Sequence, residues 1–130
     1  MVDNLWGELP DVSNVRAPYV VLKEQGNALG EITKGRLYGT VVRSLDGDRT
    51  NLTFSIIAPA LNDYTYTVAR AMHRVDLYPV MVWDTAKGGR DSEECANEKE
   101  FKAALGLILK TERVRKAIAG LLAQVNAERS

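Results

Sequence analysis

His73 is the only histidine of the chain, and Asp76 follows it by three residues. A histidine beside a carboxylate can act as a general base whose ring the acid orients. A nucleophilic triad or a metal site needs further partners, and no cysteine or second histidine stands near this pair. We interpret His73 as a strand-end residue beside a turn aspartate. A small hydrolase or nuclease using His73, Asp76 or Asp84 is the alternative.

Asp84 is followed by the triplet Glu100-Phe101-Lys102, a carboxylate and Glu-x-Lys pattern found in one nuclease superfamily. Those enzymes hold Mg²⁺ on the acids and activate water with the lysine, which requires the triplet to lie on a strand. Here the triplet opens a helix, because Asn97 and Glu100 form a capping box. No glycine-rich stretch has the context of a nucleotide-binding loop. We therefore expect no metal and no cofactor, and an enzyme is the less favoured class.

The C-terminal region carries a basic cluster that includes Arg113, Arg115 and Lys116. On a helix-turn-helix these side chains would contact DNA phosphates or bases. The helices flanking Thr111 leave almost no turn between them, and the chain as a whole is neutral, with 17 basic and 17 acidic residues. Charges on amphipathic helices usually face water. A nucleic-acid binder using this helix is thus a second alternative, and nucleic acid is an unlikely partner.

Small and weakly polar residues alternate along two predicted strands. The alternation puts them on one small, weakly polar sheet face, on which another sheet, a peptide or a second copy of the chain can lie; a plain solvated face is the alternative. The predicted binding residues are Thr53, Ser55, Thr65, Thr67, Ala69 and Ala71.

The elements that position these residues follow from hydrophobic periodicity. The length of 130 residues and the even composition predict one domain over 1–130, with an irregular arm at 1–13. Pro18 suits the first turn of a helix, and Lys34-Gly35 supplies its end, which predicts a helix over 18–34. Period-two alternation predicts strands over 36–44, 51–57, 64–73 and 78–83. An Asp-Gly turn joins the first two.

The connections are too short for crossover helices, so the fold class is α+β with a four-stranded antiparallel meander. Residues 85–97 contain Gly88-Gly89 among charged residues and predict a mobile loop. Thr111 begins a second C-terminal helix, and both helices are expected to cover one face of the sheet. The expected core residues are Leu22, Leu29, Ile32, Phe54, Tyr66, Val68, Leu105, Ile108, Ile118 and Leu122.

This order of elements is similar in outline to small secretion chaperones and to immunity or inhibitor proteins, a likeness at the level of the fold. The hypothesis that fits best is a non-catalytic protein-binding module of chaperone, immunity or regulatory type, with a protein or a second copy as partner in a homodimer. Cys95 is the only cysteine, which excludes an internal disulfide and fits a reducing compartment. With neither a secretion signal pattern nor a long apolar run, the expected location is the cytoplasm, away from membranes.

Overall fold

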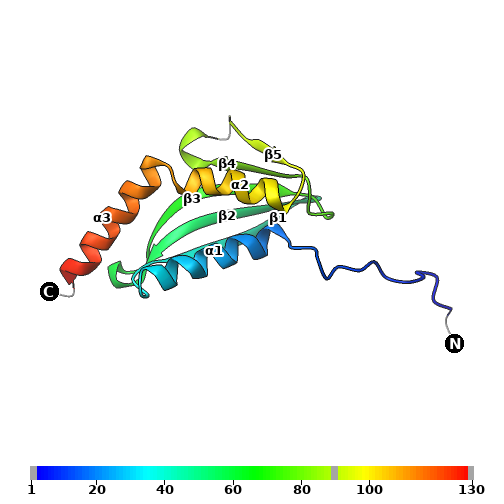
Figure 1. Ribbon diagram of the computed structural model, residues 1–130, viewed down its shortest axis with the longest axis horizontal. Helices are drawn as coiled ribbons and strands as arrows, with labels where there is room; N and C mark the ends of the chain where they lie inside the picture. Colours follow the sequence, from blue (N-terminus) through cyan, green and yellow to red (C-terminus); the bar gives the residue numbers. More distant parts are fainter. Residues whose placement is uncertain (1–2, 89–90, 129–130) are drawn as a thin grey trace.

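The computed structural model describes residues 3–88 and 91–128. Five antiparallel strands form one sheet in the order of the chain, with three helices on one side of it (Figure 1). The α+β prediction is confirmed, with five strands in place of four. The strands are β1 (Tyr38–Asp46), β2 (Arg49–Ala58), β3 (Tyr64–His73), β4 (Val80–Asp84) and β5 (Glu93–Cys95).

The first helix, α1 (Pro18–Ile32), covers the edge strand β1. Its close approach depends on glycine, because a Cβ on Gly26 would stand 2.3 Å from the carbonyl oxygen of Gly39 in β1. The helix ends before Gly35, which has φ +80°, a conformation that favours glycine. Gly30, the second glycine within α1, also faces β1, because a Cβ there would stand 2.5 Å from the ring of Tyr38.

The C-terminal helices are α2 (Glu98–Leu109) and α3 (Glu112–Glu128). The predicted cap is present, since Asn97 Oδ1 accepts from the amide of Glu100 at 2.9 Å, while Glu100 Oε1 reaches back to the amide of Ala96, one residue before the N-cap, also at 2.9 Å. α2 packs on β3, β4 and β5, whereas α3 packs beside the short helix η1 (Pro59–Leu61).

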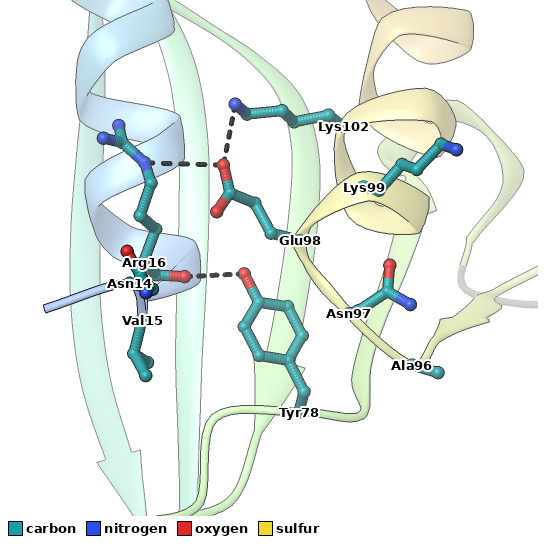
Figure 2. Close-up of a pocket in the computed structure, with 9 residues that line it drawn as sticks. All are labelled: Asn14, Val15, Arg16, Tyr78, Ala96, Asn97, Glu98, Lys99 and Lys102. Carbon is teal, nitrogen blue, oxygen red and sulfur yellow. Dashed lines mark hydrogen bonds and ion pairs between the residues drawn. The ribbon is translucent and has the colours of Figure 1, made fainter. Parts of the chain in front are cut away.

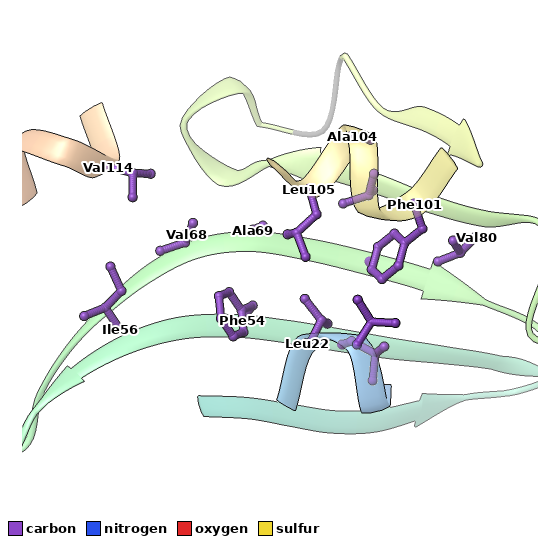
Figure 3. Close-up of a cluster of buried hydrophobic side chains, with 14 of the residues drawn as sticks. Leu22, Phe54, Ile56, Val68, Ala69, Val80, Phe101, Ala104, Leu105 and Val114 are labelled. Carbon is purple, nitrogen blue, oxygen red and sulfur yellow. The ribbon is translucent and has the colours of Figure 1, made fainter. Parts of the chain in front are cut away.

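The core lies between the sheet and the three helices, and we call this side of the sheet the covered face (Figure 3). Leu22 of α1, Phe54 of β2 and Phe101 of α2 all contribute to it and are at most 3% exposed. Most of the predicted core is buried or partly buried, but Ile32 is 79% exposed, so its assignment to the core was wrong. Ile32 is the last residue of α1 and lies at the edge of an open groove between α1 and the C-terminal helices, where its side chain stays in contact with water.

The segment predicted as a mobile loop contains ordered elements. Thr85–Lys87 forms the short helix η2, and Glu93–Cys95 is β5, paired with β4. Gly89 lies outside the described residues, and the mobility of the segment stays a prediction. The strand was missed because Glu93 and Glu94 give it no apolar alternation, and only its pairing with β4 specifies it.

Candidate functional site

The side of the sheet opposite the helices has no cover among the described residues. On β2, Leu52, Phe54 and Ile56 face the core, so alternation turns the intervening Thr53 and Ser55 to the other side. The strand register extends this side across the sheet, and we call it the open face. It includes Thr40, Val42 and Ser44 on β1, Asn51, Thr53, Ser55 and Ile57 on β2, Thr65, Thr67, Arg70 and Met72 on β3, Met81 and Trp83 on β4, and Glu94 on β5, and at the β1–β2 turn it continues to Asp46 and Arg49.

Cross-strand rows organise the open face. One row runs Thr40, Ser55, Thr67, the next runs Val42, Thr53, Arg70, Trp83, and the third runs Ser44, Asn51, Met72, Met81, Glu94. A hollow of about 430 Å³ opens where Asn51, Thr53, Arg70 and Trp83 meet. Arg70 and Glu94 are the two charged residues of these rows, both are exposed, and neither forms an ion pair within the described chain.

Four of the six predicted binding residues lie on this face. Thr53, Ser55, Thr65 and Thr67 share it, and the hydroxyl of Ser55 donates to that of Thr67 at 3.2 Å. Ser55 itself is only 5% exposed, so its neighbours cover it. Thr65 is exposed, whereas Thr53 and Thr67 are partly buried.

Ala69 and Ala71 belong to the core, and their assignment to the open face was wrong. Ala69 is 1% exposed and Ala71 is 2% exposed, and both pack with the covered-face cluster. The cause is a β-bulge in β3. Phe54 is opposite Ala69 while the next residue, Ser55, is opposite Thr67, which leaves Val68 as the extra residue. Beyond the bulge the alternation reverses, so Arg70 and Met72 take the open face instead.

Two side chains from other elements hold the bulge. The hydroxyl of Thr85 donates to the carbonyl oxygens of Thr67 and Val68 at 3.2 and 3.1 Å. Arg113 of α3 donates to the carbonyl of Val68 at 2.9 Å, to Asp84 Oδ1 at 2.6 Å and to the hydroxyl of Tyr66 at 2.7 Å. The bulge is therefore also the point where α3 is fastened to the sheet.

The three catalytic candidates, Asp84, His73 and Asp76, lie in separate places in the structure. Asp84 is 8% exposed, and its Oδ1 also accepts from the amide of Ala86, so the carboxylate anchors α3 and η2. His73 is 7% exposed, and its Nδ1 lies 2.6 Å from the carbonyl oxygen of Arg74. Asp76 is exposed on the loop after β3. The structure therefore gives each of the three a different setting.

The nuclease pattern has a structural explanation in this fold. Glu100 caps α2, and Lys102 Nζ pairs with Glu98 Oε2 at 2.7 Å, while Asp84 pairs with Arg113. Within residues 3–88 and 91–128, no three His, Cys, Asp or Glu side chains gather as they would around a metal ion. Burial raises the pKa of the Cys95 thiol to about 11, helped by Glu93, so at neutral pH it stays protonated and unreactive.

A cleft of about 650 Å³ lies between the base of the arm, Tyr78 and the start of α2 (Figure 2). Three of its charged residues, Arg16, Glu98 and Lys102, form ion pairs within the chain, and Lys99 also lines it. Arg16 pairs with Glu24 and lies 3.4 Å from Glu98, and Tyr78 donates its hydroxyl to the carbonyl of Arg16 at 2.7 Å. Burial and the nearby Glu98 raise the pKa of Tyr78, which keeps this donor protonated. The contacts of Arg16 and Tyr78 at this cleft fasten the base of the arm to the body.

The basic residues of the predicted nucleic-acid surface are dispersed. Arg113 is held by Asp84, Lys116 pairs with Glu112 at 3.2 Å, and Arg115 lies with its Nε 3.4 Å from the carbonyl of Lys110. No helix of the described chain is long and apolar enough to cross a membrane.

No match was found when the chain was compared with protein-family models, curated proteins and solved structures. Function is therefore inferred from geometry. Arg70, Met72, Met81, Trp83 and Glu94 are among the open-face residues that sequence reasoning missed. The alternation of Met81 and Trp83 with buried Val80 and Val82 was the available signal for two of them.

Proposed function

We propose that this chain is a non-catalytic protein-binding module that forms a homodimer through its open face. The observation that carries the proposal is a sheet face that no described segment covers. On it, the base Arg70 lies on one side of β4 and the acid Glu94 lies on the other. A module of the chaperone, immunity or regulatory type acts by binding another protein. The buried thiol fits a reducing compartment, so we place this binding in the cytoplasm.

The two charges suit a symmetric pair. Arg70 lies on β3 and Glu94 on β5, so β4 runs between them. If two open faces stack around a two-fold axis along β4, β3 of one copy lies over β5 of the other. Each Arg70 then approaches Glu94 of the other copy. Arg70 is level with Trp83 and Glu94 with Met81, so the two are offset along the strands by two residues, about 7 Å, which the long arginine side chain can span.

The apolar residues between these charges supply the contact area. Met81 and Trp83 lie on β4 itself, so each meets its own counterpart near the axis, with Met72 beside them. All three are partly exposed in the monomer and would leave water on association. The rest of the surface, on β1 and β2, carries small hydroxyl side chains together with Val42 and Ile57. A homodimer of this kind should bury on the order of 1,200 Å² or more in total.

Charge exchange tests the proposal. Arg70→Glu and Glu94→Arg should each weaken self-association at least tenfold, because like charges then meet across the interface. A mixture of the two variants should form a heterodimer, and Arg70→Glu/Glu94→Arg should restore the homodimer. Sedimentation equilibrium at tens of micromolar measures self-association of the two single variants, their mixture and the double variant. Lys99→Glu on α2 is the control charge reversal. A monomeric wild type, or a dimer indifferent to Arg70→Glu, would reject the open face as a dimer interface.

A further inference from the structure

The hollow on the open face gathers hydrogen-bonding side chains that have no partner in the fold. Its volume is about 430 Å³, and the open-face side chains that line it are Ser44, Asn51, Thr53, Arg70 and Trp83. Within the described residues, none of these five side chains makes a hydrogen bond or an ion pair. Polar groups that converge on a concave surface in this way are typical of a small-molecule site.

The shape of the hollow follows from side-chain size. The strand register places Thr53 beside Arg70 and Arg70 beside Trp83, on three neighbouring strands. Ser44 and Asn51 are paired in the next row, on β1 and β2. Because neighbouring strands lie only about 4.8 Å apart, the three smaller side chains form a floor beside a taller wall of Arg70 and Trp83.

The hollow carries a single positive charge. Arg70 is exposed, and a guanidinium has five N–H donors and no acceptor. The indole N–H of Trp83 is likewise a donor only. No acidic residue lines the hollow, and the acids assigned to the open face, Asp46 and Glu94, lie outside it at the β1–β2 turn and on β5. The lining therefore suits a hydrogen-bond acceptor with one negative charge.

A carboxylate attached to a planar ring matches these groups. Arginine binds a carboxylate through two parallel hydrogen bonds, and one carboxylate balances its one charge. The ring can stack on the partly exposed indole of Trp83, which is level with Arg70 on the next strand. Asn51 and Thr53 offer further hydrogen bonds from the floor. A phosphate monoester carries close to two charges at neutral pH, so a lone arginine matches it less well.

We infer that the hollow binds a small aromatic carboxylate. The site is complete within one copy, so the inference goes beyond the homodimer and does not depend on it. The two share Arg70, which the proposed dimer directs at Glu94 of the other copy. A bound carboxylate occupies that guanidinium, so the ligand should weaken self-association by binding the monomer more tightly than the dimer.

Nuclear magnetic resonance on the full chain tests the inference with benzoate as the probe. In a Trp6→Phe background Trp83 is the only tryptophan, so the spectrum contains one indole N–H signal. Benzoate should shift this signal saturably, with an affinity about tenfold or more above those of benzamide, which has no charge, and of acetate, which has no ring. A benzoate affinity no higher than that of either control, or a shift that does not saturate, would overturn the inference.

Matched variants identify the contact. Arg70→Met should lower the affinity for benzoate about tenfold or more. Arg49→Met removes another exposed arginine of the same face, outside the hollow, and should leave the affinity unchanged. Equal losses in the two variants would assign binding to the charge of the whole face and reject the hollow as the site.

Repeating the titrations in a Glu94→Arg background separates this inference from the dimer, because that change removes the proposed dimer contact and alters no residue of the hollow. Benzoate should bind there with the same dependence on Arg70. A wild type that sediments as a monomer and still binds benzoate would reject the dimer alone. A dimer whose Trp83 signal ignores benzoate in both backgrounds would reject this inference alone.

Discussion

The two faces of this sheet come from the same five strands but differ in polarity, charge and burial. The covered face carries Leu52, Phe54 and Ile56 under three helices, while the open face presents Thr53 and Arg70 beside Trp83 without cover. Alternation along a strand separates two surfaces of different composition, and the helices select the more apolar one. A sheet covered on one face only keeps its other face available for binding.

The bulge at Val68 shows how one residue controls this separation. Without it, Ala69 and Ala71 would face outward while Arg70 and Met72 pointed toward the helices. A buried arginine on the covered face would need a partner, because an unpaired charge in the core is very costly. The extra residue therefore makes the C-terminal half of β3 compatible with both the core and the open face.

The largest expected effect is a loss of stability when a side chain is removed from the covered face rather than from the open face. Phe54→Ala removes a ring that is 3% exposed and should lower the free energy of unfolding by about 3 to 5 kcal/mol, since a cavity remains among the helices. Ile57→Ala, on the open face of the same strand, should cost less than half as much. Urea unfolding measures both. Equal losses would mean that the open face is as tightly packed as the covered one.

The attachment of α3 at the bulge should give the next largest effect. Arg113→Met leaves the buried Asp84 carboxylate without its cation and should cost about 2 to 4 kcal/mol, less than a fully buried pair because Arg113 is 26% exposed. Arg113→Met/Asp84→Asn should be less destabilised than Arg113→Met alone, since the remaining charge is gone. Arg115→Met on the same helix is the control. If thermal unfolding shows Arg113→Met and Arg115→Met to be alike, the ion pair does not hold α3.

The smallest effect concerns glycine and compares a helix pressed on the sheet with one facing solvent. Gly26→Ala places a Cβ against the backbone of Gly39 and should cost about 1 to 3 kcal/mol, because that backbone is held in β1. Gly120→Ala in α3 meets open space and should stabilise the protein by about 0.5 to 1 kcal/mol. Denaturant midpoints with unchanged slopes would establish both values. Stabilisation by Gly26→Ala would contradict the close approach of α1.

Local chemistry was enough to place most of the elements. β3 begins and ends at the residues that its alternation predicts, and Asn97 with Glu100 marks the start of α2, because neighbours along the chain control strand periodicity and helix capping. Thr111 likewise separates α2 from α3. Each of these features depends on contacts within a few residues.

Contacts between distant segments decided the rest. The pairing of β5 with β4, the bulge held by Thr85 and Arg113, and the exclusion of Ile32 from the core join or separate residues far apart in sequence. A period of two continues unchanged through Val68 when the strand is considered alone. It reverses only because β2 supplies the register and α3 supplies the donors for the freed carbonyl. The tertiary structure therefore determined which side of β3 faces outward, and with it which residues can meet a partner.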